Sequence, residues 1–242
     1  NSLGVLTSGT GNIAIGYEAG DALTVGNYNT AIGASALGAI TTGAESVAVG
    51  YSALTANTTA EQNTAIGAYA GDALTTGAYN VALGYSALGA GTTATQNVAI
   101  GRHALSDGNG HYNVAVGNHA LDDNTANYNV GVGYQALYAN TSATNNVAVG
   151  AAALLVNTTG AGNTAIGKDA LRANTTATGN TALGIDALTT NTTGAQVTAG
   201  GAYSLYSNTT GDDNTAFGYY CLFANTTGAS NVAVGYNALL VN

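Results

Sequence analysis

The pattern x-Ala-x-Gly recurs at a fixed spacing along the whole chain, and this repeat constrains the fold more than any other feature. The closing glycines lie 17 residues apart, except for two steps of 16 residues. The repeats begin at residues 12, 29, 46, 63, 80, 97, 113, 129, 146, 163, 180, 197, 214 and 231. They leave no room for a linker, so the sequence predicts a single repeat domain over residues 1–242.

Several positions hardly vary from one repeat to the next. Counted from the first residue of each repeat, position 3 is Ala except at Gly131, and position 5 is always Gly. Position 8 is Ala except for Ser204 and Cys221, and position 9 is Leu except for Gly20 and Gly71. We infer that each residue lies on its counterpart in the next repeat, so that the repeats stack along one axis.

Seventeen residues are too few for a pair of helices. Positions 1–4, such as NVAI at 97–100, alternate and are rich in β-branched residues, which predicts a short strand. Gly at position 5 predicts a corner, positions 6–9 (YSAL at 51–54) a second strand, and NTTG a turn. The predicted fold is an all-β parallel β-solenoid, or β-roll, of about 14 coils with strands about 4.8 Å apart.

Asparagine dominates position 1, where Ser46 and Val197 are the exceptions. Stacked asparagines form ladders of amide hydrogen bonds in cross-β assemblies. We therefore predict a structural Asn ladder made of Asn12, Asn29, Asn63, Asn80, Asn97, Asn113, Asn129, Asn146, Asn163, Asn180, Asn214 and Asn231.

A second asparagine column lies at position 12 and begins Asn-Thr-Thr or Asn-Thr-Ser, the acceptor pattern for N-glycosylation. Its members are Asn57, Asn140, Asn157, Asn174, Asn191, Asn208 and Asn225. One interpretation is a stripe of glycans. The other, which we favour, is a turn in which Asn adopts left-handed backbone and the threonines make local hydrogen bonds.

Composition excludes several classes of protein. Three basic residues against twelve acidic ones give a net charge of -9, which excludes nucleic acid as a partner. No apolar run approaches 18 residues, so we expect no membrane insertion within this segment. Because neither end carries a polar cap, we expect a segment of a longer fibre or a subunit capped by its neighbours.

The residues that could carry chemistry are few. His103 and His119 share position 7, but two imidazoles without a third ligand make a poor metal site. Asp169 and Asp186 also share position 7, at a separation that would suit a retaining glycosidase. That column is otherwise solvated, however, and no aromatic cleft is evident around the two acids.

Other isolated signals point to structure rather than catalysis. Lys168 and Arg172 are expected to balance the two acids, and Cys221 to be a small buried side chain. The dinucleotide-like matches at 9–14 and 131–136 open no predicted helix. We therefore expect no enzyme, no catalytic residues, no metal and no cofactor.

Tyrosine recurs at position 6, as Tyr17, Tyr51, Tyr85, Tyr134, Tyr219 and Tyr236. An amphipathic ring suits a contact surface for a glycan or a protein. The alternative is that each ring covers the glycine corner of its own coil.

The pentapeptides SVAVG (46–50), NVAIG (97–101), NVAVG (146–150 and 231–235) and NIAIG (12–16) resemble the head repeat of trimeric autotransporter adhesins, the YadA-like heads. The 17-residue form also resembles repeats of bacterial and phage fibre proteins that precede endosialidase-type chaperone domains. The resemblance implies a left-handed roll and a coaxial homotrimer. The Ala columns at positions 3 and 8 face either a partner chain or a thin coil interior.

These observations favour a structural and adhesive fibre segment, either an adhesin head or a tail-fibre-like part, located outside the cell or on a virion surface. We expect a homo-oligomer or filament that binds a host-surface glycan or protein. The alternatives are a glycosylated self-assembling filament, a glycan-hydrolysing tailspike segment and an ice-binding solenoid. Ice binding is suggested by Thr at positions 13 and 14, of which only one rank would face outwards on a strand.

Overall fold

The computed structural model describes residues 2–241 and has one three-residue strand in each repeat, at positions 2–4. It contains two compact units, residues 1–125 and residues 126–242. The first unit holds β1 (Ile13–Ile15), β2 (Thr30–Ile32), β3 (Val47–Val49), β4 (Thr64–Ile66), β5 (Val81–Leu83), β6 (Val98–Ile100) and β7 (Val114–Val116). The second holds β8 (Val130–Val132), β9 (Val147–Val149), β10 (Thr164–Ile166), β11 (Thr181–Leu183), β12 (Thr198–Gly200), β13 (Thr215–Phe217) and β14 (Val232–Val234).

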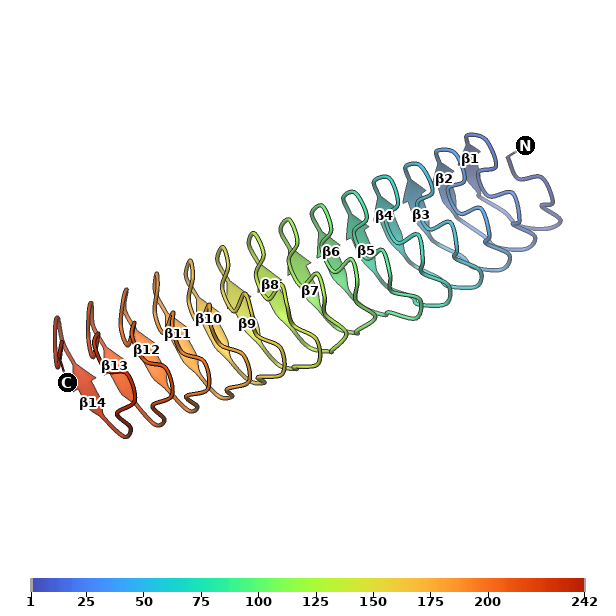
Figure 1. The fold of residues 1–242 in the computed structure, drawn as a ribbon. Helices are drawn as coiled ribbons and strands as arrows, with labels where there is room; N and C mark the ends of the chain where they lie inside the picture. Colours follow the sequence, from blue (N-terminus) through green and yellow to red (C-terminus); the bar gives the residue numbers. More distant parts are fainter. Residues whose placement is uncertain (1, 242) are drawn as a thin grey trace. The chain divides into compact units, whose positions relative to one another are not determined.

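Within each unit the strands pair in parallel and in chain order (Figure 1). The register matches position to position, so that Ala48 lies opposite Ala65 in the first unit, and Ala165 opposite Ala182 in the second. No helix occurs among residues 2–241. The predicted all-β parallel solenoid, with one coil for each repeat, is confirmed.

Hydrogen bonds between coils continue beyond the short strands. In the coil of β3 the amide of Ser52 donates to Ala34 O at 2.9 Å, and that of Leu54 donates to Ala70 O at 3.0 Å. Bonds of this kind recur along most of the coil and in both units. The backbone of each coil is therefore bonded to its neighbours even where it forms turns, which satisfies polar groups that would otherwise be buried unpaired.

The prediction of a second strand at positions 6–9 is wrong. These residues form turns, and positions 7 and 9 have left-handed backbone, as at Ser52 (φ 53°) and Leu54 (φ 50°). The physical reason is that Ala53 and Leu54 are both fully buried. Adjacent residues of a strand point to opposite faces, so two consecutive inward side chains require a turn.

Glycine at position 5 is required by both conformation and space. Gly167 has φ 139°, and a β-carbon there would overlap the carbonyl oxygen of Gly184 in the next coil. At this corner the backbones of adjacent coils therefore lie too close together for a residue that has a β-carbon.

The core of each coil is thin and consists mainly of the Ala of positions 3 and 8 and the Leu of position 9. The Ala side chains of positions 3 and 8 point into the coil interior. Of the two interpretations of the Ala columns, the structure therefore supports the thin coil interior. Where position 9 is Gly, as at Gly71, the side chain of Leu54 in the preceding coil lies against it, and position 12 of the same coil holds a buried Leu, Leu74.

Candidate functional surfaces

The position-1 asparagines lie inside the coil and link successive coils. Asn163 Oδ1 accepts from the backbone amide of Asn180 at 2.9 Å, and Asn163 Nδ2 donates to Ala177 O at 2.9 Å. Direct bonds between amides also occur, for example from Asn80 Nδ2 to Asn63 Oδ1 at 3.0 Å. The main link is therefore from side chain to backbone, and its role is structural.

Where position 1 is not Asn, at Ser46 and Val197, the side chain of the Asn in the preceding coil still accepts a hydrogen bond. The backbone amides of Ser46 and Val197 donate to Asn29 Oδ1 and Asn180 Oδ1, at 3.0 and 2.8 Å. Because the acceptor is bonded to a backbone amide, the side chain of the next residue can vary without loss of that bond.

The position-12 asparagines are not available for modification, and the glycan stripe is corrected here. Asn57, Asn140, Asn157, Asn174, Asn191, Asn208 and Asn225 are all 0–2% exposed. Asn174 Nδ2, the atom a glycan would occupy, donates to Asn157 Oδ1 at 2.8 Å and to Ala177 O at 3.1 Å. A folded coil has no space for a sugar at this atom. The column is a second internal amide ladder.

The two ladders meet at the carbonyl of position 15. Ala177 O accepts from both Asn163 Nδ2 and Asn174 Nδ2, so both of its lone pairs are used. Asn57 is different, because Ile40 and Leu74 occupy position 12 in the adjacent coils. Neither its buried Nδ2 nor its buried Oδ1 has a hydrogen-bond partner among the residues that the structure describes.

The outer face of the sheet carries an apolar surface that the sequence prediction missed. Side chains at positions 2 and 4 point away from the core and are Val, Ile, Leu, Thr or Phe, with Gly200 as the one exception. Ile66, Leu83 and Ile166 are 40, 42 and 43% exposed. No position-2 or position-4 residue of any repeat is charged. We call these two columns the outer sheet face.

Gly200 and Phe217, which are neighbours on adjacent strands, show how the outer sheet face accommodates a change in side-chain size. Gly200 stands where other coils have a branched side chain, and the ring of Phe217 in the next coil lies against it. A β-carbon at Gly200 would collide with that ring. The small residue and the large one therefore fill a common space on the outer sheet face.

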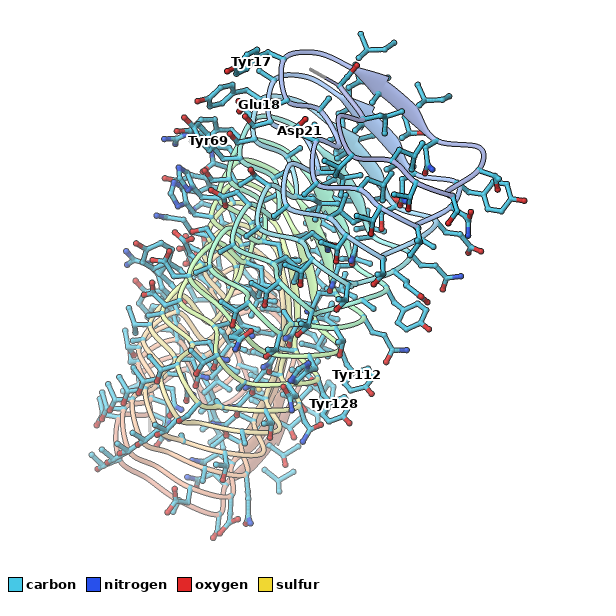
Figure 2. All side chains as sticks on the ribbon, turned by 90° about the vertical axis from the view of Figure 1, so that its right-hand side faces the viewer. Tyr17, Glu18, Asp21, Tyr69, Tyr112 and Tyr128 are labelled. Carbon is cyan, nitrogen blue, oxygen red and sulfur yellow. The ribbon has the colours of Figure 1, made fainter. Side chains whose placement is uncertain are left out.

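The position-6 tyrosines Tyr17, Tyr51, Tyr85, Tyr134, Tyr219 and Tyr236 are all exposed. In the first unit, Tyr69 at position 7 packs edge-on against Tyr51 and Tyr85, with ring centroids 5.3 and 5.8 Å away. Partial burial raises the pKa of the Tyr69 phenol, with the two neighbouring rings contributing. Figure 2 shows Tyr17 and Tyr69 projecting from one edge of this unit and Tyr112 from the opposite edge.

The line of rings continues from Tyr85 to His103 at 5.5 Å, and from His103 to His119, which stack at 5.0 Å. His119 Nδ1 also lies 2.5 Å from Asp122 Oδ2. Within the described part of the chain, no three His, Cys, Asp or Glu side chains are grouped in a way that could hold a metal ion. The paired histidines thus extend an aromatic edge.

A second aromatic group lies in the last coils of the second unit. Tyr203 stacks on Tyr220 at 5.0 Å, and Tyr219 stacks on Tyr236 at 5.8 Å. Tyr219, Tyr220, Phe223 and Tyr236 also line an open hollow of about 580 Å³. Tyr219 also meets Tyr220 edge-on at 4.4 Å, so the group combines stacked and edge-on contacts.

The carboxylates considered for glycosidase chemistry have protein partners. Asp169 lies 2.5 Å from Lys168 Nζ and 3.4 Å from Arg172 Nε. The hydrogen bond to Asp169 raises the pKa of the Lys168 ammonium. Asp186 Oδ1 accepts from Thr189 Oγ1 at 3.4 Å. Among the described residues both cations pair with Asp169 and neither pairs with Asp186, so the expected balance is found for one of the two acids.

Cys221 and the two dinucleotide-like matches, the remaining features of the sequence, lie in structural parts of the coils. Cys221 is buried, its thiol donates to Ala233 O at 3.2 Å, and burial raises the pKa of that thiol. The dinucleotide-like match at 9–14 overlaps the start of β1 and that at 131–136 overlaps the end of β8, and no helix follows either one in the described sequence.

Two further findings concern the chain as a whole. The described residues include no helix long and apolar enough to span a membrane. Neither a protein-family model, nor a curated protein, nor a solved structure matches this chain.

Proposed function

We propose that this chain is a segment of a structural, adhesive extracellular fibre, related to the YadA-like head repeats that its pentapeptides resemble. In this proposal the solenoid coils assemble with copies of themselves as a homotrimer. The observation that carries the proposal is the outer sheet face, whose exposed side chains are apolar or Thr and never charged.

A second copy of the chain suits this face for two reasons. A partner with the same coil repeat presents its side chains at the same spacing, so coil can pack against coil along the whole contact. The chain carries a net charge of -9, which opposes self-association elsewhere on its surface. Because positions 2 and 4 hold none of that charge, identical faces approach each other without repulsion there.

The exposed tyrosine edges supply the adhesive part of the proposal. Tyr51, Tyr69 and Tyr85 form an uninterrupted series of rings at the surface of the first unit. Tyrosine offers an apolar ring and a polar hydroxyl with little loss of side-chain entropy, which suits a glycan or protein ligand on a host surface.

The test is the mass of the full chain in solution, measured by light scattering. We expect three times the chain mass of 23.6 kDa. The double variant Ile166→Lys with Leu183→Lys places two charges on the outer sheet face and should yield a single-chain mass. The matched control, Thr176→Lys with Thr193→Lys, changes exposed residues of the same two coils on another surface and should leave the mass unchanged. A single-chain mass for the unmodified protein would refute the trimer.

A further inference from the structure

The second unit carries two adjacent columns of hydroxyl side chains at positions 13 and 14. Position 13 is occupied by Thr141, Thr158, Thr175, Thr192, Thr209 and Thr226, and position 14 by Ser142, Thr159, Thr176, Thr193, Thr210 and Thr227. The expectation that only one rank faces outwards is wrong. These residues form a bend rather than a strand, and both columns reach solvent, as Thr158 and Thr159 do.

The position-13 hydroxyls are held in place by the neighbouring coil. Thr158 Oγ1 donates to Thr175 O at 3.1 Å, and Thr192 Oγ1 donates to Thr209 O at 3.0 Å. The bond fixes the side-chain rotamer and leaves the lone pairs of the hydroxyl oxygen free to accept from water. The result is a row of oxygens at the coil spacing.

Thr159, Thr176, Thr193 and Thr210 at position 14 are exposed, and their hydroxyls form no hydrogen bond with any of the described residues. The outward positions on either side, 11 and 16, are occupied by small or uncharged residues in the coils of β8 to β13, apart from Asp212. Apart from Asp212, the surface therefore carries no charge and presents the methyl groups and hydroxyls of the threonines. We call it the threonine face.

The spacing of this face matches a lattice of water. Hydrogen bonds of about 2.75 Å at the tetrahedral angle separate next-nearest oxygens in ice by about 4.5 Å. The coil repeat is about 4.8 Å. Over the five steps between six coils the difference accumulates to about 1.5 Å, which is less than the length of one hydrogen bond. One row of threonines can thus follow one row of lattice oxygens.

We propose that the threonine face binds ice. Its hydroxyls hold water at lattice positions, and its methyl groups exclude water that does not fit the lattice, so the face joins the surface of a growing crystal. This function uses a different surface from the self-association proposed above, and it does not depend on that proposal.

The test is thermal hysteresis and the shape of ice crystals in a solution of the full chain. We expect a gap between melting and freezing temperatures, faceted crystals, and uptake of the protein into a slowly grown ice hemisphere. Thr176→Lys with Thr193→Lys should abolish most of the gap, because two long charged side chains hold the lattice away from the face.

The control is the pair Ile166→Lys with Leu183→Lys, which should retain the hysteresis at equal chain concentration. Circular dichroism of both variants establishes that the coils are folded. Absence of hysteresis and of ice uptake in the unmodified chain would overturn the proposal. Equal loss in both folded double variants would overturn it as well, because the activity would then not depend on the threonine face.

Discussion

Asn174 donates a hydrogen bond from its side-chain amide to Asn157 Oδ1 in the preceding coil, at 2.8 Å, and both side chains are completely buried. A buried amide is tolerated when its donors and acceptor are paired, and is costly when they are not. The same residue type at position 12 therefore has opposite effects on stability in different coils.

Asn174→Leu is expected to destabilise the protein by about 2 to 3 kcal/mol, because Asn157 Oδ1 and the amide of Asn191 each lose a buried partner. Asn57→Leu, between Ile40 and Leu74, is expected to stabilise it by about 1 kcal/mol, because it removes an amide with no partner. Thermal unfolding monitored by circular dichroism measures both shifts. A fall in midpoint for Asn57→Leu would contradict the assignment of Asn57 as unpaired.

Gly167→Ala is expected to cost more than about 3 kcal/mol, since φ 139° is strained for any side chain and the new β-carbon overlaps Gly184 O. The matched control is Gly162→Ala, where φ is 68° and no atom lies within 4 Å of the added carbon. There only the left-handed backbone is penalised, at about 1 kcal/mol. Denaturant unfolding of the two variants should separate them clearly, and equal losses would show that close stacking of the corner is unimportant.

Cys221 predicts a dependence of stability on alkaline pH. Burial raises the pKa of its thiol above the value in the unfolded chain, so the unfolded state releases this proton first as pH rises. The contribution of Cys221 to stability is therefore complete below the unfolded thiol pKa and is lost as pH rises through the folded one. Cys221→Ala restores the residue of the other repeats and should gain in midpoint relative to wild type between pH 8 and pH 10 (about one unit on either side of pH 9).

The measurement is a pair of thermal scans across that pH range, in which titration of other groups is common to both proteins. A constant difference in midpoint between wild type and Cys221→Ala would show that the thiol is not protected from ionisation by the fold.

Tyr69→Ala tests the aromatic edge of the first unit. Removing the ring between Tyr51 and Tyr85 eliminates two edge-on contacts at the surface and should cost about 1 to 2 kcal/mol. On a glycan array or against host-cell extracts, the variant should lose most of any binding shown by the unmodified chain. The control Tyr134→Ala removes a position-6 ring in the second unit, outside this series, and unchanged binding by both variants would exclude the edge as the adhesive surface.

The stacking of coils could be predicted because the period alone determines it. Nearly invariant Ala at position 3 and Gly at position 5 require that like residues lie on one another, and the strand register confirms this for both units. The prediction of a strand at positions 6–9 is wrong because these residues are bonded between coils as turns. Two adjacent, nearly invariant apolar positions, such as Ala53 and Leu54, already exclude a strand with one buried face.

The interior location of the position-12 asparagines could also have been inferred. Leu23, Ile40 and Leu74 occupy the same position in other repeats, and an apolar residue in a column indicates that the column is internal. The Asn-Thr-Thr pattern by itself fits an N-glycosylation acceptor or a turn, and neither interpretation places the asparagine inside the coil. The outer sheet face could not be predicted from the β-branched residues at positions 2 and 4 alone, because such residues favour a strand whether its outer side is covered or exposed.

The position-12 ladder of the second unit also has a direction. From Asn157 to Asn225 each side-chain amide donates to the coil before it, and from Asn157 to Asn208 each also accepts from the coil after it. Dipoles aligned head to tail in this way polarise one another. A coil added in the reverse orientation would place its amide donors against the donors of the column. Further coils can therefore be added in only one orientation, as in a filament whose two ends are chemically distinct.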